Sequence, residues 1–129
     1  MITEGRRFLL AVLLMAVSWG LGVVQYTTLL LAFFPDGKLL WAAFSLGVGA
    51  LGIAAPSSPG AVGVLELALV GALAVFGLDP STALAFALTV HLLQYVITGV
   101  LGAIALARDG ETLAGMYRQV RHLPEKEQA

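Results

Sequence analysis

Glu66 is the only ionisable side chain deep within an apolar stretch of this 129-residue chain. A charge at the centre of a membrane-type helix costs about 2.5–3.5 kcal/mol on insertion scales, so it normally has a partner or faces a watery cavity. One interpretation is that the carboxylate contacts a cationic head group or a proton. The other is that it caps free N–H groups at a helix start, or that burial holds it protonated. Nothing local neutralises the charge, which favours the first interpretation.

A second set of polar side chains, His91, Gln94, Tyr95 and Thr98, lies within the apolar stretch at residues 82–107. Their spacing places them on one face of a helix. In the middle of a bilayer such side chains must find partners in the protein or in water. The ordinary role of a lone histidine there is a hydrogen bond between helices, and a ligand contact is the alternative. No second histidine or carboxylate lies three or four positions from His91, so we expect no metal ion.

The segment Pro56-Ser57-Ser58-Pro59-Gly60 interrupts the apolar sequence between these two sets. Each proline removes a helical hydrogen bond and pushes the preceding residue toward extended geometry, so helix must stop before the segment and restart after it. Ser58 as N-cap and Pro59 as first helical residue predict the new start. Its free N–H groups would suit an anionic lipid group. The alternative is a hydrophilic loop that only joins two helices.

The composition indicates what kind of protein must position these residues. Hydrophobic residues make up 59% of the chain and charged residues only 12%, about half the share in soluble domains. The absence of cysteine excludes disulfides, thiolate metal sites and cysteine nucleophiles. The net charge of −1, with basic residues mostly near the chain ends, excludes a nucleic-acid footprint. The chain also has no phosphate-binding loop and no cluster of acidic metal ligands, so we assign no catalytic residue and no cofactor.

The apolar stretches predict an all-α, polytopic membrane bundle with helices at about 8–34, 39–55, 60–77 and 81–107, forming one domain over residues 1–107. The first and last reach about 40 Å, enough for a hydrocarbon core of about 30 Å. The middle two reach only about 25 Å. They are either two further spans or a broken, re-entrant hairpin, and charge counting does not separate these arrangements. In the first of them, Ser45, Gly49 and Gly52 form a small-residue stripe suited to close helix packing.

The polar tail at residues 108–129 predicts a short amphipathic helix. Its apolar positions, Leu113, Met116, Tyr117 and Val120, recur at helical spacing. Arg6 and Arg7 precede the first long helix, and most other basic residues follow the last one. Because basic residues stay on the cytoplasmic side, we expect both termini in the cytoplasm and a multi-pass protein of the cytoplasmic membrane.

Several of these motifs together resemble the transmembrane-region family of lysylphosphatidylglycerol synthase, also called flippase-like integral membrane proteins. The resemblance covers about residues 8–108, and known members are usually much longer, so the chain is similar to their C-terminal part. It is carried by Ala55-Pro56-Ser57-Ser58-Pro59-Gly60, Gly63, Leu65-Glu66, Phe76-Gly77, His91-Leu92-Leu93-Gln94-Tyr95, and the segment at 99–102.

This resemblance implies a protein that handles lipid head groups or polyprenyl-phosphate intermediates. The expected function is a lipid-translocating or head-group-binding module. The alternatives are a non-catalytic subunit or anchor assisting a lipid- or polyprenyl-phosphate-modifying enzyme, and an enzyme that transfers a group to a lipid phosphate. The expected partners are membrane lipid and either a second copy or other membrane helices. The candidate lipid-binding residues are Ser57, Ser58, Gly60, Glu66, His91, Gln94 and Tyr95.

Overall fold

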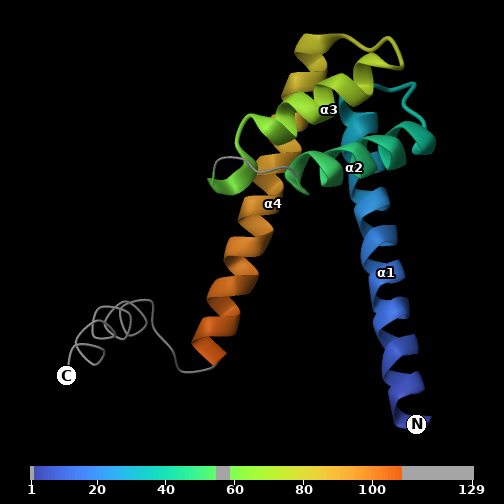
Figure 1. Cartoon of the computed structure of the whole chain (residues 1–129). Helices are drawn as coiled ribbons and strands as arrows, with labels where there is room; N and C mark the ends of the chain where they lie inside the picture. The colour runs from blue at the N-terminus through green and yellow to red at the C-terminus, as the bar shows by residue number, and fades with distance from the viewer. Residues whose placement is uncertain (1, 55–58, 109–129) are drawn as a thin grey trace, which may run out of the picture. The chain divides into compact units, whose positions relative to one another are not determined.

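Four α-helices make up most of the computed structural model, which describes residues 2–54 and 59–108 (Figure 1). They are α1 (Ile2–Phe33), α2 (Leu39–Ala54), α3 (Val64–Ala74) and α4 (Pro80–Arg108), with a short 3₁₀ turn, η1 (Pro59–Ala61), before α3. Every regular element in these ranges is helical, which confirms the all-α class. The amphipathic helix predicted in the tail lies outside the described residues. Met1–His91 form one compact unit and Leu92–Ala129 a second.

The helices fall into two length classes, as predicted. Gly5–Phe33 and Pro80–Arg108, of 29 residues each, are long and apolar enough to cross a membrane. At 1.5 Å per residue, the 16 residues of α2 reach about 24 Å and the 11 residues of α3 only about 16 Å. A hydrocarbon core of about 30 Å is longer than either of them. These lengths favour the re-entrant arrangement for the middle pair.

The start of α3 differs from the prediction. Gly60, Ala61 and Gly63 have positive φ angles of 78°, 54° and 86°, so an α-helix does not run through them. The prolyl start at Pro59 begins only the 3₁₀ turn, and the prediction of an α-helix from that residue is wrong. The α-helix begins at Val64, after Gly63 as its N-cap. Glycine adopts this left-handed geometry without steric cost, and two of the three positions carry it.

Within the first unit, Phe86 of α4 packs against α1. Its ring meets those of Tyr26 and Phe33 edge-on, with centroid distances of 6.0 and 6.2 Å. Lipid tails are as apolar as these side chains, so van der Waals fit rather than transfer from water stabilises the contact in a bilayer. The buried cluster that includes this contact also contains residues of α2 and α3. Its members are Tyr26, Leu30, Ala42, Leu65, Leu69, Leu73, Ala83, Phe86, Ala87 and Val90.

Small residues bring α2 and α3 together along their lengths. A Cβ atom on Gly49 would lie 3.2 Å from the side chains of Leu65 and Leu69. Ser45 and Gly49 are buried in this contact region, as expected for a packing stripe. At the other end of the pair, the rings of Trp41 and Phe76 stack with centroids 5.2 Å apart. The two short helices therefore pack as an antiparallel hairpin, side by side in Figure 1.

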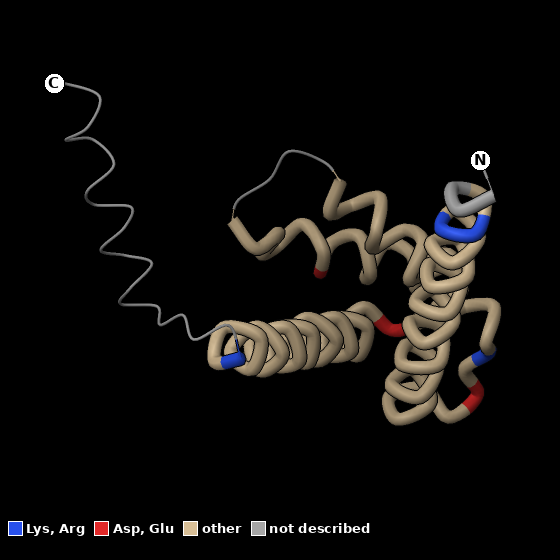
Figure 2. Tube along the Cα trace, turned by 90° about the horizontal axis from the view of Figure 1, so that it is seen from below, with Lys and Arg blue, Asp and Glu red and all other residues tan. Residues whose placement is uncertain are grey.

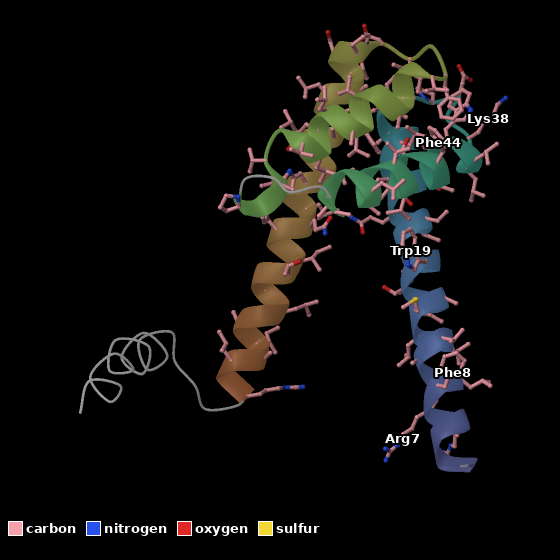
Figure 3. All side chains as sticks on the ribbon, in the orientation of Figure 1. Arg7, Phe8, Trp19, Lys38 and Phe44 are labelled. Carbon is pink, nitrogen blue, oxygen red and sulfur yellow. The ribbon has the colours of Figure 1, made fainter. Side chains whose placement is uncertain are left out.

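Residues 5–21 of α1 have exposed side chains, which the other described residues do not cover. Phe8 and Trp19 project outward, with 70% and 49% of their surface exposed (Figure 3). The charged residues of the described helices and turns lie near helix ends and in connections, and Glu66 lies in the first turn of α3 (Figure 2). That distribution is typical of helices that face lipid.

Candidate functional site

Glu66 and His91 form a buried side-chain pair. Nδ1 of His91 lies 2.5 Å from Oε1 of Glu66, although the residues are 25 positions apart in the chain. The two residues are only 8% and 7% exposed. Glu66, which lacks a neutralising neighbour in the sequence, thus obtains its partner from the middle of α4.

Two backbone groups of the turn before α3 complete the site. Nε2 of His91 lies 3.0 Å from the carbonyl oxygen of Gly60, and Oε2 of Glu66 accepts a hydrogen bond of 2.7 Å from the N–H of Gly63. Glu66 occupies the third position of α3, so it reaches back to the N-cap as the acidic half of a capping box does. The carboxylate therefore caps the start of α3, which is one of the two interpretations drawn from the sequence, and it also contacts a histidine of α4.

The positive φ angles at Gly60 and Gly63 explain why this geometry is possible. They turn the chain so that the carbonyl of Gly60 faces His91 of α4, while the N–H of Gly63 faces the side chain of Glu66. The N–H of Gly63, which precedes the first residue of α3, is thus paired with a carboxylate of the same helix.

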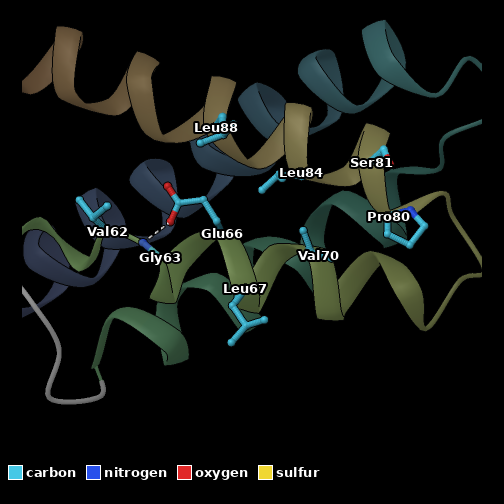
Figure 4. Close-up of a pocket in the computed structure, with 9 residues that line it drawn as sticks. All are labelled: Val62, Gly63, Glu66, Leu67, Val70, Pro80, Ser81, Leu84 and Leu88. Atoms are coloured by element: carbon cyan, nitrogen blue, oxygen red, sulfur yellow. Dashed lines mark hydrogen bonds between the residues drawn. The ribbon is translucent and has the colours of Figure 1, made fainter.

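A groove runs along α3 and the first turns of α4, with a volume of about 630 Å³ (Figure 4). This lies within the range of about 300–1,000 Å³ that is typical of small-molecule sites. Glu66 is the only ionisable residue among those that line it, and nearly all the others are apolar. The lining residues are Val62, Gly63, Glu66, Leu67, Val70, Pro80, Ser81, Leu84 and Leu88.

The other predicted site residues are not brought to this groove. Gln94 and Tyr95 are exposed and belong to the second unit, whereas His91 ends the first. Ser57 and Ser58 lie outside the described residues, and Gly60 contributes its carbonyl to His91. Among residues 2–54 and 59–108, no three His, Cys, Asp or Glu side chains come together in a way that holds a metal ion.

Sequence reasoning missed the role of Gly63 and of the groove leucines. A signal for Gly63 was present, because it precedes Glu66 by three positions, the spacing of an N-cap and its reciprocal acidic residue. Leu67 and Leu84 carried no such signal, since apolar residues are common throughout both helices. Only the packing of α3 against α4 identifies them as neighbours of one groove.

The sequence model of the lysylphosphatidylglycerol synthase TM region matches residues 1–102. The chain belongs to this family. The matched span contains the whole of the Glu66–His91 pair, the turn before α3 and the groove. No curated protein and no solved structure is significantly similar to the chain. Membership of the lysylphosphatidylglycerol synthase TM region family, together with the two long apolar helices, makes this a membrane protein.

Proposed function

We propose that this protein is a flippase-like module of the cytoplasmic membrane that binds lipid head groups and moves lipid between leaflets. The observation that carries the proposal is the groove of α3 and α4, which is apolar along its length and has one carboxylate in its wall. A lipid has the same division into an apolar chain and a polar head. Leu67, Leu84 and Leu88 would contact an acyl chain, and Glu66 would contact the head group.

The hydrogen bonds of Glu66 leave it able to accept a further donor. A carboxylate has about four acceptor positions on its two oxygens. His91 uses one on Oε1, and Gly63 uses one on Oε2. The ammonium or hydroxyl group of a lipid head can therefore bind without breaking the pair. The family description names lysylphosphatidylglycerol, whose lysyl group carries a positive charge, and this favours an aminoacylated lipid as the substrate.

Reconstitution of the full chain into phosphatidylcholine vesicles tests the proposal. Fluorescent lysylphosphatidylglycerol and phosphatidylglycerol would be compared for movement between leaflets by chemical quenching of the outer leaflet. Leu84→Trp fills the groove, whereas Leu101→Trp changes an exposed leucine of the same helix that does not line it.

We expect faster movement of the lysylated lipid with the natural chain and with Leu101→Trp. With Leu84→Trp we expect at least a tenfold loss at an unchanged helical circular dichroism signal. Equal rates for all three proteins, or no movement above protein-free vesicles, would refute the transport role.

A second candidate, the non-catalytic subunit or anchor, is favoured by a different observation. The most apolar window of α1 has no side chain buried within the chain, and Phe8 and Trp19 remain open to neighbours. Such a surface suits self-association or contact with other membrane helices, which would complete the bundle. If the reconstituted chain alone is inactive and gains activity with a co-expressed membrane partner, this second function is the correct one.

A further inference from the structure

We infer that Glu66 and His91 together form a binding site for one proton, and that this proton holds the turn before α3 to α4. The inference goes beyond lipid binding and depends on the proposed function only in its consequence for transport. It follows from counting hydrogens in the three contacts around the pair.

The carbonyl of Gly60 fixes the first hydrogen. A carbonyl oxygen only accepts, so Nε2 of His91 must donate across the 3.0 Å contact. The other ring nitrogen, Nδ1, then faces Oε1 of Glu66 at 2.5 Å. A hydrogen bond at this distance requires a second hydrogen, carried either by Nδ1 or by Oε1. The first case is imidazolium with carboxylate, and the second is neutral imidazole with carboxylic acid.

Both arrangements contain the same single shared proton and have no net charge. When it leaves to water or hydroxide, a carboxylate oxygen faces a nitrogen lone pair. If the ring instead adopts its other tautomer, the lone pair of Nε2 faces the carbonyl of Gly60. Either way, one of the two contacts that join His91 to residues 60–66 is lost. The pair also acquires a net negative charge in an apolar setting, which favours opening toward water.

The described elements around the pair place no other basic side chain at the carboxylate of Glu66. Of the described residues, α2 contributes no ionisable side chain, and α1 contributes only Tyr26 to the buried cluster. Asp79, at the start of α4, accepts hydrogen bonds from Thr82. Tyr95 follows His91 by four positions in the same helix. None of these groups is a cation, so the described part of the chain offers the carboxylate of Glu66 no basic side chain other than His91.

The consequence is a pH-dependent connection between two helices that line the groove. With the proton bound, residues 60–66 are held to α4. Without it, Glu66 keeps its hydrogen bond to Gly63, but one of the two contacts between His91 and residues 60–66 is lost, so the turn is held less firmly to α4 at the groove end near Val62. Given the proposed function, a cationic head group at Glu66 binds better when the pair has lost the shared proton and is negatively charged, so proton and lipid binding are thermodynamically linked.

The variant Glu66→Gln provides a sharp test because an amide reproduces the protonated acid. Its NH₂ group donates to Nδ1, and its oxygen accepts from the N–H of Gly63, but the amide itself does not titrate. Spin labels at Val62→Cys and Ala85→Cys, two exposed positions, would report the distance between the turn and α4. The natural chain has no cysteine, so these labels are specific.

Distances would be measured by pulsed electron paramagnetic resonance from pH 4 to 10, in phosphatidylcholine nanodiscs without aminoacylated lipid. In the same series, ¹⁵N-labelled histidine would be followed in a His122→Gln background, which leaves His91 as the sole histidine. We expect the parent chain to lose its short-distance population at the pH at which the His91 signal changes. Glu66→Gln should keep the short distance and the Nε2–H tautomer at the alkaline pH values at which the parent chain loses its short-distance population.

Two results would overturn the inference. One is a parent chain whose His91 signal and label distance are both constant across this range. The other is a transition of the same size in Glu66→Gln, which would assign the titration to other groups. Because no transported lipid is present, a failure of lipid movement would not produce either result, and the two proposals fail separately.

Discussion

Gly52 of α2 and Ala68 of α3 are in such close contact that a Cβ atom on Gly52 would lie 2.8 Å from the Cβ atom of Ala68. A methyl group at that distance forces the helices apart, since packed interiors do not absorb added volume without strain. The hairpin of α2 and α3 therefore depends on the absence of a side chain at this position. Because α3 carries Glu66, the spacing of the hairpin also positions the proton-binding pair.

Gly52→Ala should destabilise the protein by about 1–3 kcal/mol, the usual cost of overpacking. Gly47→Ala is the matched control, because the same addition in the same helix meets nothing within 4 Å. That control should be neutral or stabilising by up to about 1 kcal/mol, since alanine is the better helix former. Denaturant unfolding in detergent, followed by circular dichroism, measures both. Equal effects would mean that the two helices do not meet at Gly52.

Removing one member of the Glu66–His91 pair should cost more than removing both. His91→Leu leaves a buried carboxylate without its partner, a change that typically costs about 3–5 kcal/mol. Replacing both residues by leucine removes the unpaired group as well and should recover most of that loss. A double-mutant cycle in the same unfolding assay gives the coupling.

Thr89→Ala serves as the control for this cycle, because the Thr89 hydroxyl donates to the carbonyl of Ala85 in its own helix. It should change the stability by less than about 0.5 kcal/mol. Additive effects of the two leucine substitutions would contradict a direct contact between Glu66 and His91.

The long helices were predictable because a helix that spans a bilayer needs about 20 apolar residues, and both α1 and α4 contain apolar stretches longer than that. The start of α3 was not predictable, because Ser58-Pro59 has residue types that favour a helix start whether a 3₁₀ turn or an α-helix follows. Positive φ angles at Gly60 and Gly63 decided the outcome, and glycine permits them without requiring them. The contact of Glu66 with His91 depends on that turn, so it too lay beyond sequence periodicity.

Acid should loosen the first turn of α4. Oδ2 of Asp79 accepts hydrogen bonds of 2.8 Å from both the N–H and the hydroxyl of Thr82, and these bonds hold the pKa of Asp79 below its ordinary value. A lowered pKa means that the stabilisation is present above the pKa of the unfolded chain and is lost as pH falls through the folded value. Amide hydrogen exchange at Thr82, corrected for its intrinsic pH dependence, should therefore accelerate at acidic pH.

Asp79→Asn is the matched control for that measurement, because asparagine also caps helices but does not titrate in this range. Thr82 should then exchange at a corrected rate that does not change with acidification. A similar acid response in both proteins would assign it to a group other than Asp79.

Both chain ends should lie in the cytoplasm, because Arg6 and Arg7 lie near the start of α1 and Arg108 ends α4. Alkaline phosphatase fused after Arg108 should be inactive, while green fluorescent protein at the same point should fluoresce. Phosphatase fused after Lys38, in the turn between α1 and α2, should be active. The reverse pattern would invert the orientation.

The turn before α3 should lie within the membrane rather than at its cytoplasmic face. The 11 residues of α3 cover only about 16 Å, which is about half of a hydrocarbon core of about 30 Å. If the C-terminal end of α3 lies at the outer surface, its N-terminal end therefore lies inside the membrane and not at the cytoplasmic surface. Val62, 61% exposed in this turn, is a suitable reporter position. In inside-out vesicles, Arg108→Cys should react rapidly with a membrane-impermeant thiol reagent, whereas Val62→Cys should react at least tenfold more slowly. Lys38→Cys should react only in vesicles of the opposite orientation. If Val62→Cys instead reacts as fast as Arg108→Cys, then α2 and α3 connect through a cytoplasmic loop, and the groove opens to the aqueous side rather than to lipid.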